Sequence, residues 1–152
     1  MRQITSGVTT KNAREMKKKS WSDRSHLKSV RNPSSQAYEI KIKNPEITFE
    51  GVNGQPDFAC AYITVYPNEK VIELKSLKMY FFQFRDKVLS YERMINVIYD
   101  DLLEIYKPHR LRLVMLFNAR GGISSKLCID SDWKSRGGSE DFKDWLGQED
   151  TW

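Results

Sequence analysis

Residues 90–106 read SYERMINVIYDDLLEIY and carry the clearest structural signal of the chain. Apolar side chains recur there every three or four residues, which is the spacing of a helix that buries one face. Ser90 is a suitable N-cap, and Pro108 cannot continue a helix. The stretch predicts a helix from Tyr91 to about Tyr106, with a buried face formed by Tyr91, Met94, Ile95, Ile98, Leu102 and Ile105.

Two strands are predicted after this helix. Residues 111–117 place Leu111, Leu113, Met115 and Phe117 at every second position, which is the period of a strand. Residues 121–122 are both glycine and lead into a second extended run at residues 123–129. Because paired glycines are typical of hairpin turns, we predict that these two strands pair.

Two further strands and a helical region are predicted before it. Residues 38–43 alternate apolar and charged side chains until Asn44-Pro45, which ends or bends the strand. Residues 57–66 form a longer extended run that is apolar on both faces. Residues 76–85 are dense in aromatic side chains at roughly helical spacing. These segments complete a strand, strand, helix, helix, strand, strand order.

This order predicts an α+β domain in which two helices cover one face of an antiparallel four-stranded sheet. Such a sheet has two open edges, and pairing of edges between copies closes a ring. We therefore expect a homo-oligomer.

Composition narrows the class of protein. The chain has 152 residues, of which 39% are hydrophobic and 30% charged, as expected for one domain with a real core. No apolar run approaches the ~18 residues that span a membrane, and the N-terminus lacks the apolar stretch of a secretory signal. We expect a soluble, cytoplasmic protein without a membrane partner. Cys60 and Cys128 form neither a disulfide framework nor a zinc motif, and we predict no metal site.

Charge is unevenly distributed along the chain. Residues 1–35 carry nine Lys and Arg against two acids, and residues 129–152 carry three against seven. We predict a basic mobile arm at 1–35, a folded domain at 36–130 and an acidic C-terminal tail at 131–152. The arm is either a solubilising tail or a segment that contacts RNA, DNA or phosphates.

Several charged residues stand beside apolar ones. Asp57 follows Pro56 and precedes Phe58, so it is either a turn acid or a proton donor with a raised pKa. Glu92 lies in the first turn of the predicted helix, where a carboxylate favours the helix N-terminus. The alternative is that Glu92 accepts paired N–H groups from a guanine-like heterocycle.

The same residues carry a family resemblance. The sequence GQPDFA at 54–59, ELKSLKMY at 73–80 and RGGI at 120–123 occur in the order and near the spacings of one family, together with Phe84-Arg85, Glu92, Asn96 and Asp101-Leu102. Over residues 36–130 the chain resembles the NADPH-dependent 7-cyano-7-deazaguanine reductases, the QueF-like family of the queuosine pathway. The resemblance implies the tunnelling fold, with active sites between subunits.

The resemblance also implies roles for individual residues. Glu92 would hold the 7-deazaguanine ring with Tyr91 and Ser76 beside it, and Asp57 would donate a proton. The NADPH segment would be Glu73, Leu74, Lys75, Ser76, Leu77 and Lys78, with Arg120, Gly121 and Gly122 as further contacts. Lys75 and Lys78 suit cofactor phosphates, which need cations.

Two positions depart from the family. The family has a nucleophilic Cys just before Gly54, which adds to the nitrile and gives a thioimide. Here the aligned position falls on Glu50 or, with a one-residue deletion, on Gly51. A Glu50 carboxylate is a much weaker nucleophile toward a nitrile than a thiolate. Tyr91 stands where the family has a substrate-contacting His.

These features lead to one main hypothesis and one alternative. The main hypothesis is an oxidoreductase that reduces a nitrile or C=N group of a 7-deazapurine with NADPH, without the usual thioimide. The alternative is a non-catalytic or divergent 7-deazaguanine-binding protein, acting alone or as partner of an active homologue. In either case the basic arm leaves open a base within a nucleic acid as the substrate.

Overall fold

The computed structural model describes residues 21–132 and Trp152. Along these residues the elements are η1 (Arg24–His26), β1 (Ser29–Arg31), β2 (Ile40–Glu50), β3 (Pro56–Tyr66), β4 (Lys70–Ile72), α2 (Leu74–Phe82), η2 (Gln83–Asp86), α3 (Tyr91–Tyr106), β5 (Arg110–Arg120) and β6 (Ile123–Asp130). No helix of this part of the chain is long and apolar enough to cross a membrane.

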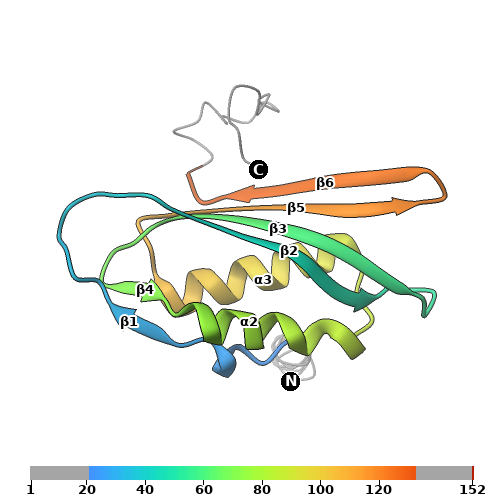
Figure 1. Cartoon of the computed structure of the whole chain (residues 1–152), viewed down its shortest axis with the longest axis horizontal. Helices are drawn as coiled ribbons and strands as arrows, with labels where there is room; N and C mark the ends of the chain where they lie inside the picture. Colours follow the sequence, from blue (N-terminus) through green and yellow to red (C-terminus); the bar gives the residue numbers. More distant parts are fainter. Residues whose placement is uncertain (1–20, 133–151) are drawn as a thin grey trace, which may run out of the picture.

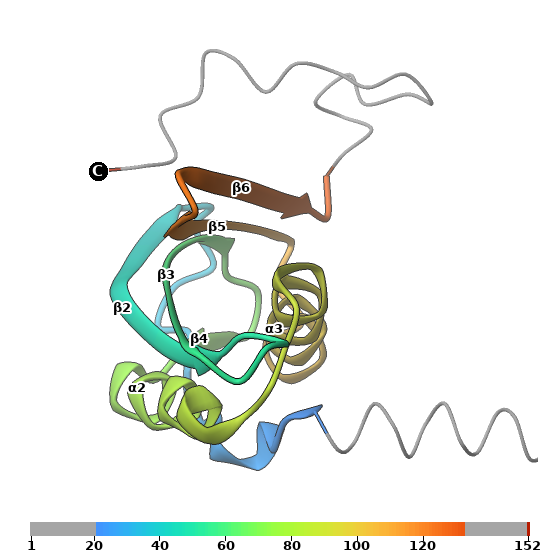
Figure 2. The same cartoon turned by 90° about the vertical axis from the view of Figure 1, so that its right-hand side faces the viewer.

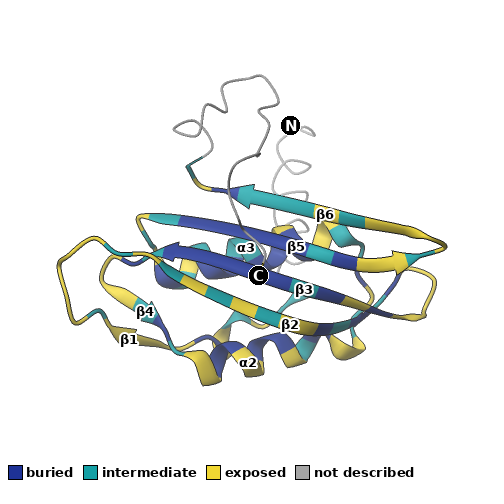
Figure 3. Ribbon diagram, turned by 45° about the horizontal axis from the view of Figure 1, so that its top comes forward, coloured by how far each residue is buried: buried dark blue, intermediate teal, exposed yellow. Residues whose placement is uncertain are grey.

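One antiparallel sheet has the strand order β2-β3-β5-β6, as the sequence predicts. Both helices lie on the same face of the sheet, with α2 beneath β2 and α3 beneath β5 and β6 (Figures 1 and 2). The two central strands are the most buried part of the sheet, with consecutive buried residues at 61–65 of β3 and 111–115 of β5 (Figure 3). The core lies in this layer and includes Ile63, Leu113, Met115, Phe84 and Ile98.

The predicted second helix is confirmed at both ends. The Ser90 side chain accepts a hydrogen bond of 3.1 Å from the Arg93 amide, which satisfies a donor of the first turn. Lys107 closes the helix in the left-handed conformation, with φ 43°. Its amide donates to the Leu103 carbonyl at 3.0 Å, and Pro108 follows.

The aromatic segment before α3 forms two elements. Glu73 caps α2, because its carboxylate accepts from the Ser76 amide at 2.7 Å. The chain then tightens into η2, which carries Phe84 into the core.

Strand β2 is longer than the sequence predicts, because Asn44-Pro45 bends it without ending it. The Asn44 side chain accepts a 3.1 Å hydrogen bond from the Glu46 amide, and the pairing with β3 shifts register between Asn44 and Ile47. Proline is tolerated at such a bulge on an edge strand, since its missing N–H faces no partner. The strand therefore continues to Glu50.

The folded domain begins earlier than the predicted boundary at residue 36. Strand β1 pairs antiparallel with β4, and Leu27 is buried in the core. Residues 21–31 are thus part of the domain, which the polar composition of this segment conceals. Residues 1–20 of the predicted arm, and 133–151 of the predicted tail, lie outside the described residues.

Candidate functional site

A cavity of about 330 Å³ lies at the N-terminal end of α3. Its wall comes from the β2–β3 loop, the start of β3, the first turn of α3 and the end of β5. The lining residues are Gly51, Val52, Asn53, Asp57, Leu89, Ser90, Tyr91, Glu92 and Arg120. The fold thus brings together five positions that the sequence analysis singled out, although up to 69 positions separate them: Gly51, Asp57, Tyr91, Glu92 and Arg120.

Asp57 is the buried acid of this cavity, with 4% of its surface exposed. The Tyr91 hydroxyl donates a 2.7 Å hydrogen bond to its Oδ2, and Arg120 Nε lies 3.5 Å from the same oxygen. Its Oδ1 accepts from the Phe58 amide at 3.0 Å. A phenol and a guanidinium therefore compensate the carboxylate for its burial.

Aromatic packing fixes the Tyr91 ring. It stacks on Phe117 with centroids 4.1 Å apart and 11° between the planes, and Phe49 meets it edge-on at 5.9 Å. The hydrogen bond to Asp57, burial and the Asp57 charge all raise the pKa of Tyr91. The phenol is therefore neutral at physiological pH and keeps a proton that it can donate.

Glu92 projects from the first turn of α3 and is exposed at the cavity. Among the described residues no side chain pairs with its carboxylate; only its backbone carbonyl accepts, from Asn96 at 2.8 Å. The helix N-terminus favours a negative charge at this position. Both carboxylate oxygens are thus available to a ligand that carries adjacent N–H groups.

Arg120 joins the end of β5 to the β2–β3 loop. It donates to the Gln55 side chain at 2.7 Å and to the Pro56 carbonyl. Gly121 and Gly122 follow with φ of 58° and 81°, values that a two-residue hairpin turn requires. The turn thereby aims Arg120 at Asp57, while neither glycine lines the cavity itself.

The structure separates the two candidates for the position of the missing Cys. The Glu50 backbone is held by the segment before α3, donating to Lys87 and accepting from Leu89 at 3.0 Å, and Glu50 does not line the cavity. Gly51 does line it. A Cβ added at Gly51 would lie 3.6 Å from Asp57 Oδ2 and 3.2 Å from Asn53 Oδ1. The described part of the cavity wall therefore has a glycine, and not a thiol, beside the Asp57 carboxylate.

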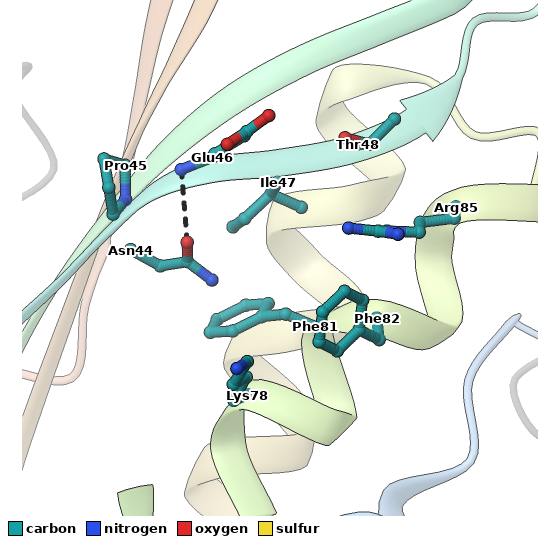
Figure 4. Close-up of a pocket in the computed structure, with 9 residues that line it drawn as sticks. All are labelled: Asn44, Pro45, Glu46, Ile47, Thr48, Lys78, Phe81, Phe82 and Arg85. Carbon is teal, nitrogen blue, oxygen red and sulfur yellow. Dashed lines mark hydrogen bonds between the residues drawn. The ribbon is translucent and has the colours of Figure 1, made fainter. Parts of the chain in front are cut away.

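The segment that resembles an NADPH motif lies elsewhere, along α2. Lys78 lines a second cavity of about 270 Å³ together with Arg85 and Phe82, under the bulge of β2 (Figure 4). Lys78 Nζ and the Arg85 guanidinium lie 5.8 and 4.2 Å from the Phe82 ring centroid. Arg85 and Phe82 were not predicted as site residues. The seven-residue spacing of Lys78 and Arg85, about two helical turns, is a signal that could have pointed to Arg85.

Other members of this segment have different surroundings. Leu74 and Lys75 are exposed, whereas Leu77 is buried. The Ser76 hydroxyl is committed inside the fold, donating to Glu73 O at 2.7 Å and accepting from the Lys28 amide at 3.0 Å. Backbone and hydroxyl contacts with Ser76 lower the pKa of Glu73.

Comparisons with known proteins agree with this arrangement. The family model described as QueF-like protein matches residues 56–136. The chain is 48% identical over 105 residues to an NADPH-dependent 7-cyano-7-deazaguanine reductase of Prochlorococcus marinus (strain MIT 9515), covering 68% of this chain and 77% of the relative. A Chlorobium chlorochromatii (strain CaD3) protein of the same name is 39% identical over 93 residues, covering 60% and 80%.

A solved structure supports the fold. The apo crystal structure of the archaeosine synthase QueF-Like has a TM-score of 0.53 and 11% sequence identity, covering 64% of this chain and 95% of that one. At this identity the likeness concerns the fold alone, and it confirms the predicted α+β tunnelling fold. With the family match over more than half of the chain, these findings establish that the chain belongs to the QueF-like protein family.

Proposed function

We propose that this protein uses NADPH to reduce the nitrile of 7-cyano-7-deazaguanine to an aminomethyl group, in the queuosine pathway. The observation that carries the proposal is the convergence of Asp57, Tyr91, Glu92 and Arg120 on one cavity. The names of the relatives supply the reaction class. An α3 carboxylate facing a buried, phenol-bonded acid suits a heterocycle that is held at one end and protonated at the other.

In this proposal Glu92 binds the base. A guanine-like edge presents neighbouring N–H donors, and a carboxylate with two free oxygens accepts both. Glu92 is exposed at the cavity and has no side-chain partner in the described part of the chain, so binding breaks no existing contact. The ring would then extend toward Asp57 and Tyr91.

Asp57 and Tyr91 handle the proton. Nitrile reduction to an amine adds two hydrides at carbon and two protons at nitrogen, and the bound cofactor supplies hydride. The Tyr91 phenol holds the proton and donates a 2.7 Å hydrogen bond to the Asp57 carboxylate. Arg120 holds the carboxylate in place at 3.5 Å from Oδ2. These three groups form the proton-delivering wall of the cavity.

The cavity under the bulge suits NADPH. Lys78 and Arg85 offer cations for phosphates, and the Phe82 face between them offers a stacking surface. Lys75 adds a further exposed cation one turn earlier. The start of α2, which carries these cations, is formed by Glu73, Leu74, Ser76 and Leu77.

We propose that active sites form between copies of this chain in a homo-oligomeric ring. The two cavities have no residue in common. In the proposed ring, one copy would supply the base site and its neighbour the cofactor site. Two exposed apolar side chains support this: Val52 lines the base site and is 77% exposed, and Ile123, at the start of β6, is 75% exposed. A neighbouring subunit would cover them.

The alternative proposal is a 7-deazaguanine-binding protein that does not catalyse the reduction, alone or beside an active homologue. It is favoured by the gap at Gly51, where the resemblance leads us to expect a thiol. Loss of a covalent nucleophile costs up to about 10⁶ in rate. Glu50 does not fill the gap from its position outside the cavity wall.

A turnover assay distinguishes the two proposals. The full chain is incubated with 7-cyano-7-deazaguanine and NADPH, and cofactor oxidation and product mass are followed together. A product heavier by four hydrogens, formed in step with cofactor loss, supports the reductase. Saturable binding of the base without turnover supports the binding protein.

The base site is tested by calorimetric titration of variants. Glu92→Gln should lose most of the affinity, because one oxygen of the acceptor pair becomes a donor. Glu104→Gln, at the far end of the same helix, is the matched control and should bind normally. Equal affinity of the two variants would contradict the assignment of the pocket.

A further inference from the structure

The sheet has a second face, opposite to the helices, and the end of the chain lies against it (Figures 2 and 3). Strand alternation places Lys41 and Lys43 of β2 on this outer face, and Tyr62 of β3 beside them. Lys43 and Tyr62 are directly opposite in the register. Trp152 is in contact with all three side chains.

The contacts form a small cradle. The Trp152 and Tyr62 rings meet edge-to-face, with centroids 5.1 Å apart and 67° between the planes. Lys41 Nζ lies 5.9 Å from the Trp152 ring centroid. Lys43 Nζ donates to the Trp152 backbone oxygen, and the Tyr62 hydroxyl lies 3.5 Å from the same oxygen. These are favourable geometries for aromatic pairs and for cations on indole.

The cradle is organised without the indole. Lys43 Nζ lies 5.5 Å from the Tyr62 ring centroid. Lys41 also donates to Thr64 at 3.4 Å and lies 3.6 Å from Glu39. The aromatic floor and its two cationic neighbours are therefore positioned by β2 and β3 themselves, and half of the Trp152 surface remains exposed above them.

We propose that Lys41, Lys43 and Tyr62 form a docking site for the Trp152 side chain of the same chain. The proposal is independent of the catalytic one. The segment 133–151 can reach about 60 Å when extended, enough to cross the sheet. Tethering keeps the local indole concentration in the millimolar range, so contacts that would be weak between separate molecules suffice.

Charge supports the same occupant. Residues 133–152 contain five acids and three bases, whereas the cradle presents two lysines. The two lysines therefore attract an occupant that is part of an acidic segment, and the Tyr62 ring favours an aromatic side chain such as that of Trp152. While Trp152 is docked, this part of the outer face is closed to other partners.

Fluorine NMR of the full chain labelled with 5-fluorotryptophan tests the proposal. The chain has four tryptophans, which single Trp→Phe variants assign. We expect the Trp152 signal to be shifted from that of free 5-fluorotryptophan amide. Tyr62→Leu should move it toward the free position, and Lys41→Gln with Lys43→Gln should do so without touching the aromatic floor.

Tyr66→Leu is the matched control, since Tyr66 lies on the same strand and face but bonds to Glu39. It should leave the Trp152 signal in place. A wild-type signal at the free position, or one unchanged by both cradle variants, would overturn the proposal. A signal that shifts only with rising protein concentration would assign the site to a second copy and also refute docking within one chain.

Discussion

The hydroxyl of Tyr91 and the Oδ2 of Asp57 are 2.7 Å apart, joined across 34 positions of sequence. The bond connects the first turn of α3 to the start of β3 and sets the protonated face of the cavity. Because Arg120 also approaches Oδ2, the charge of the carboxylate is already balanced, and in the proposed reaction the substrate nitrogen would lie beside it. The phenol is the group beside it that holds a proton at neutral pH.

Tyr91→Phe removes the phenol hydroxyl and tests its role as a proton donor. Stacking of the ring on Phe117 is retained, so we expect normal folding and base affinity. Removal of a proton donor should lower turnover about 10²-fold or more. Steady-state kinetics beside calorimetric binding checks this, and unchanged kcat would show that Asp57 needs no help from the phenol.

Gly51→Cys should place a thiol beside the acid. Gly51 does not have the positive φ that restricts Gly54, Gly121 and Gly122, so a side chain is tolerated once the Asn53 side chain yields. With 7-cyano-7-deazaguanine we expect a covalent thioimide, visible as a mass increase of the intact protein.

Glu50→Cys is the control for that graft, because residue 50 does not line the cavity. It should give no adduct. Adduct formation by Glu50→Cys and none by Gly51→Cys would show that the loop is arranged differently around the base.

Asp101→Ala tests how residues 22–24 are attached to the rest of the domain. The buried carboxylate accepts from Ser22 Oγ at 2.5 Å, Tyr80 Oη at 2.6 Å and Arg24 Nε at 2.9 Å. Removing it leaves a buried phenol without an acceptor, and we expect the free energy of unfolding to fall by about 3 kcal/mol. Urea denaturation checks this, with the exposed Asp86→Ala as a nearly neutral control.

Lys107→Gly should stabilise the protein. Lys107 holds φ 43° at the end of α3, a conformation that costs a residue with a side chain roughly 1 kcal/mol. Lys107→Ala keeps that cost and serves as the comparison. A higher thermal midpoint for the glycine variant than for the alanine variant would confirm the effect, and the reverse order would contradict it.

Tyr106 gives a prediction in pH. Burial raises the pKa of Tyr106 to about 12, and its hydroxyl donates to the Lys28 carbonyl at 2.8 Å. A tyrosine in the unfolded chain has a pKa near 10. The contribution of the buried Tyr106 hydroxyl to the free energy of unfolding is therefore complete below about pH 10 and is lost as the pH rises to 12.

The wild-type protein should therefore lose roughly 2 kcal/mol more than Tyr106→Phe between these pH values. Urea midpoints measured at several pH values check the difference. A gap between the two proteins that stays constant with pH would refute it.

The parts of the fold that follow from local pattern were predictable. Helix α3 has a cap, a periodic apolar face and a proline just past its end, and the β5–β6 hairpin has its paired glycines. The long strands could be read from alternation. The β1–β4 pair could not, because three exposed residues have no periodicity and their partner lies about forty positions away.

The candidate site was predictable as a set of residues but not as an arrangement. Asp57, Glu92 and Arg120 were found through motif positions, yet the Tyr91 bond to Asp57 depends on how α3 meets β3. The choice between Glu50 and Gly51 likewise depends on which residue faces the cavity. Phe82 and Arg85 were not predicted as site residues, because the cavity over them depends on the bulge of β2.

The bulge at Asn44–Ile47 also limits how copies of this chain can join. It divides the edge of β2 that faces away from β3, which is bridged to Val88 at Glu50, into two short stretches that are out of phase with each other. A strand that paired with β2 in the hydrogen-bond register of one stretch would be out of register with the other unless it had a matching bulge. A shift of the register by two residues would therefore lose hydrogen bonds. In the proposed ring, the edge strand of a neighbouring copy would therefore have a single permitted alignment along this edge.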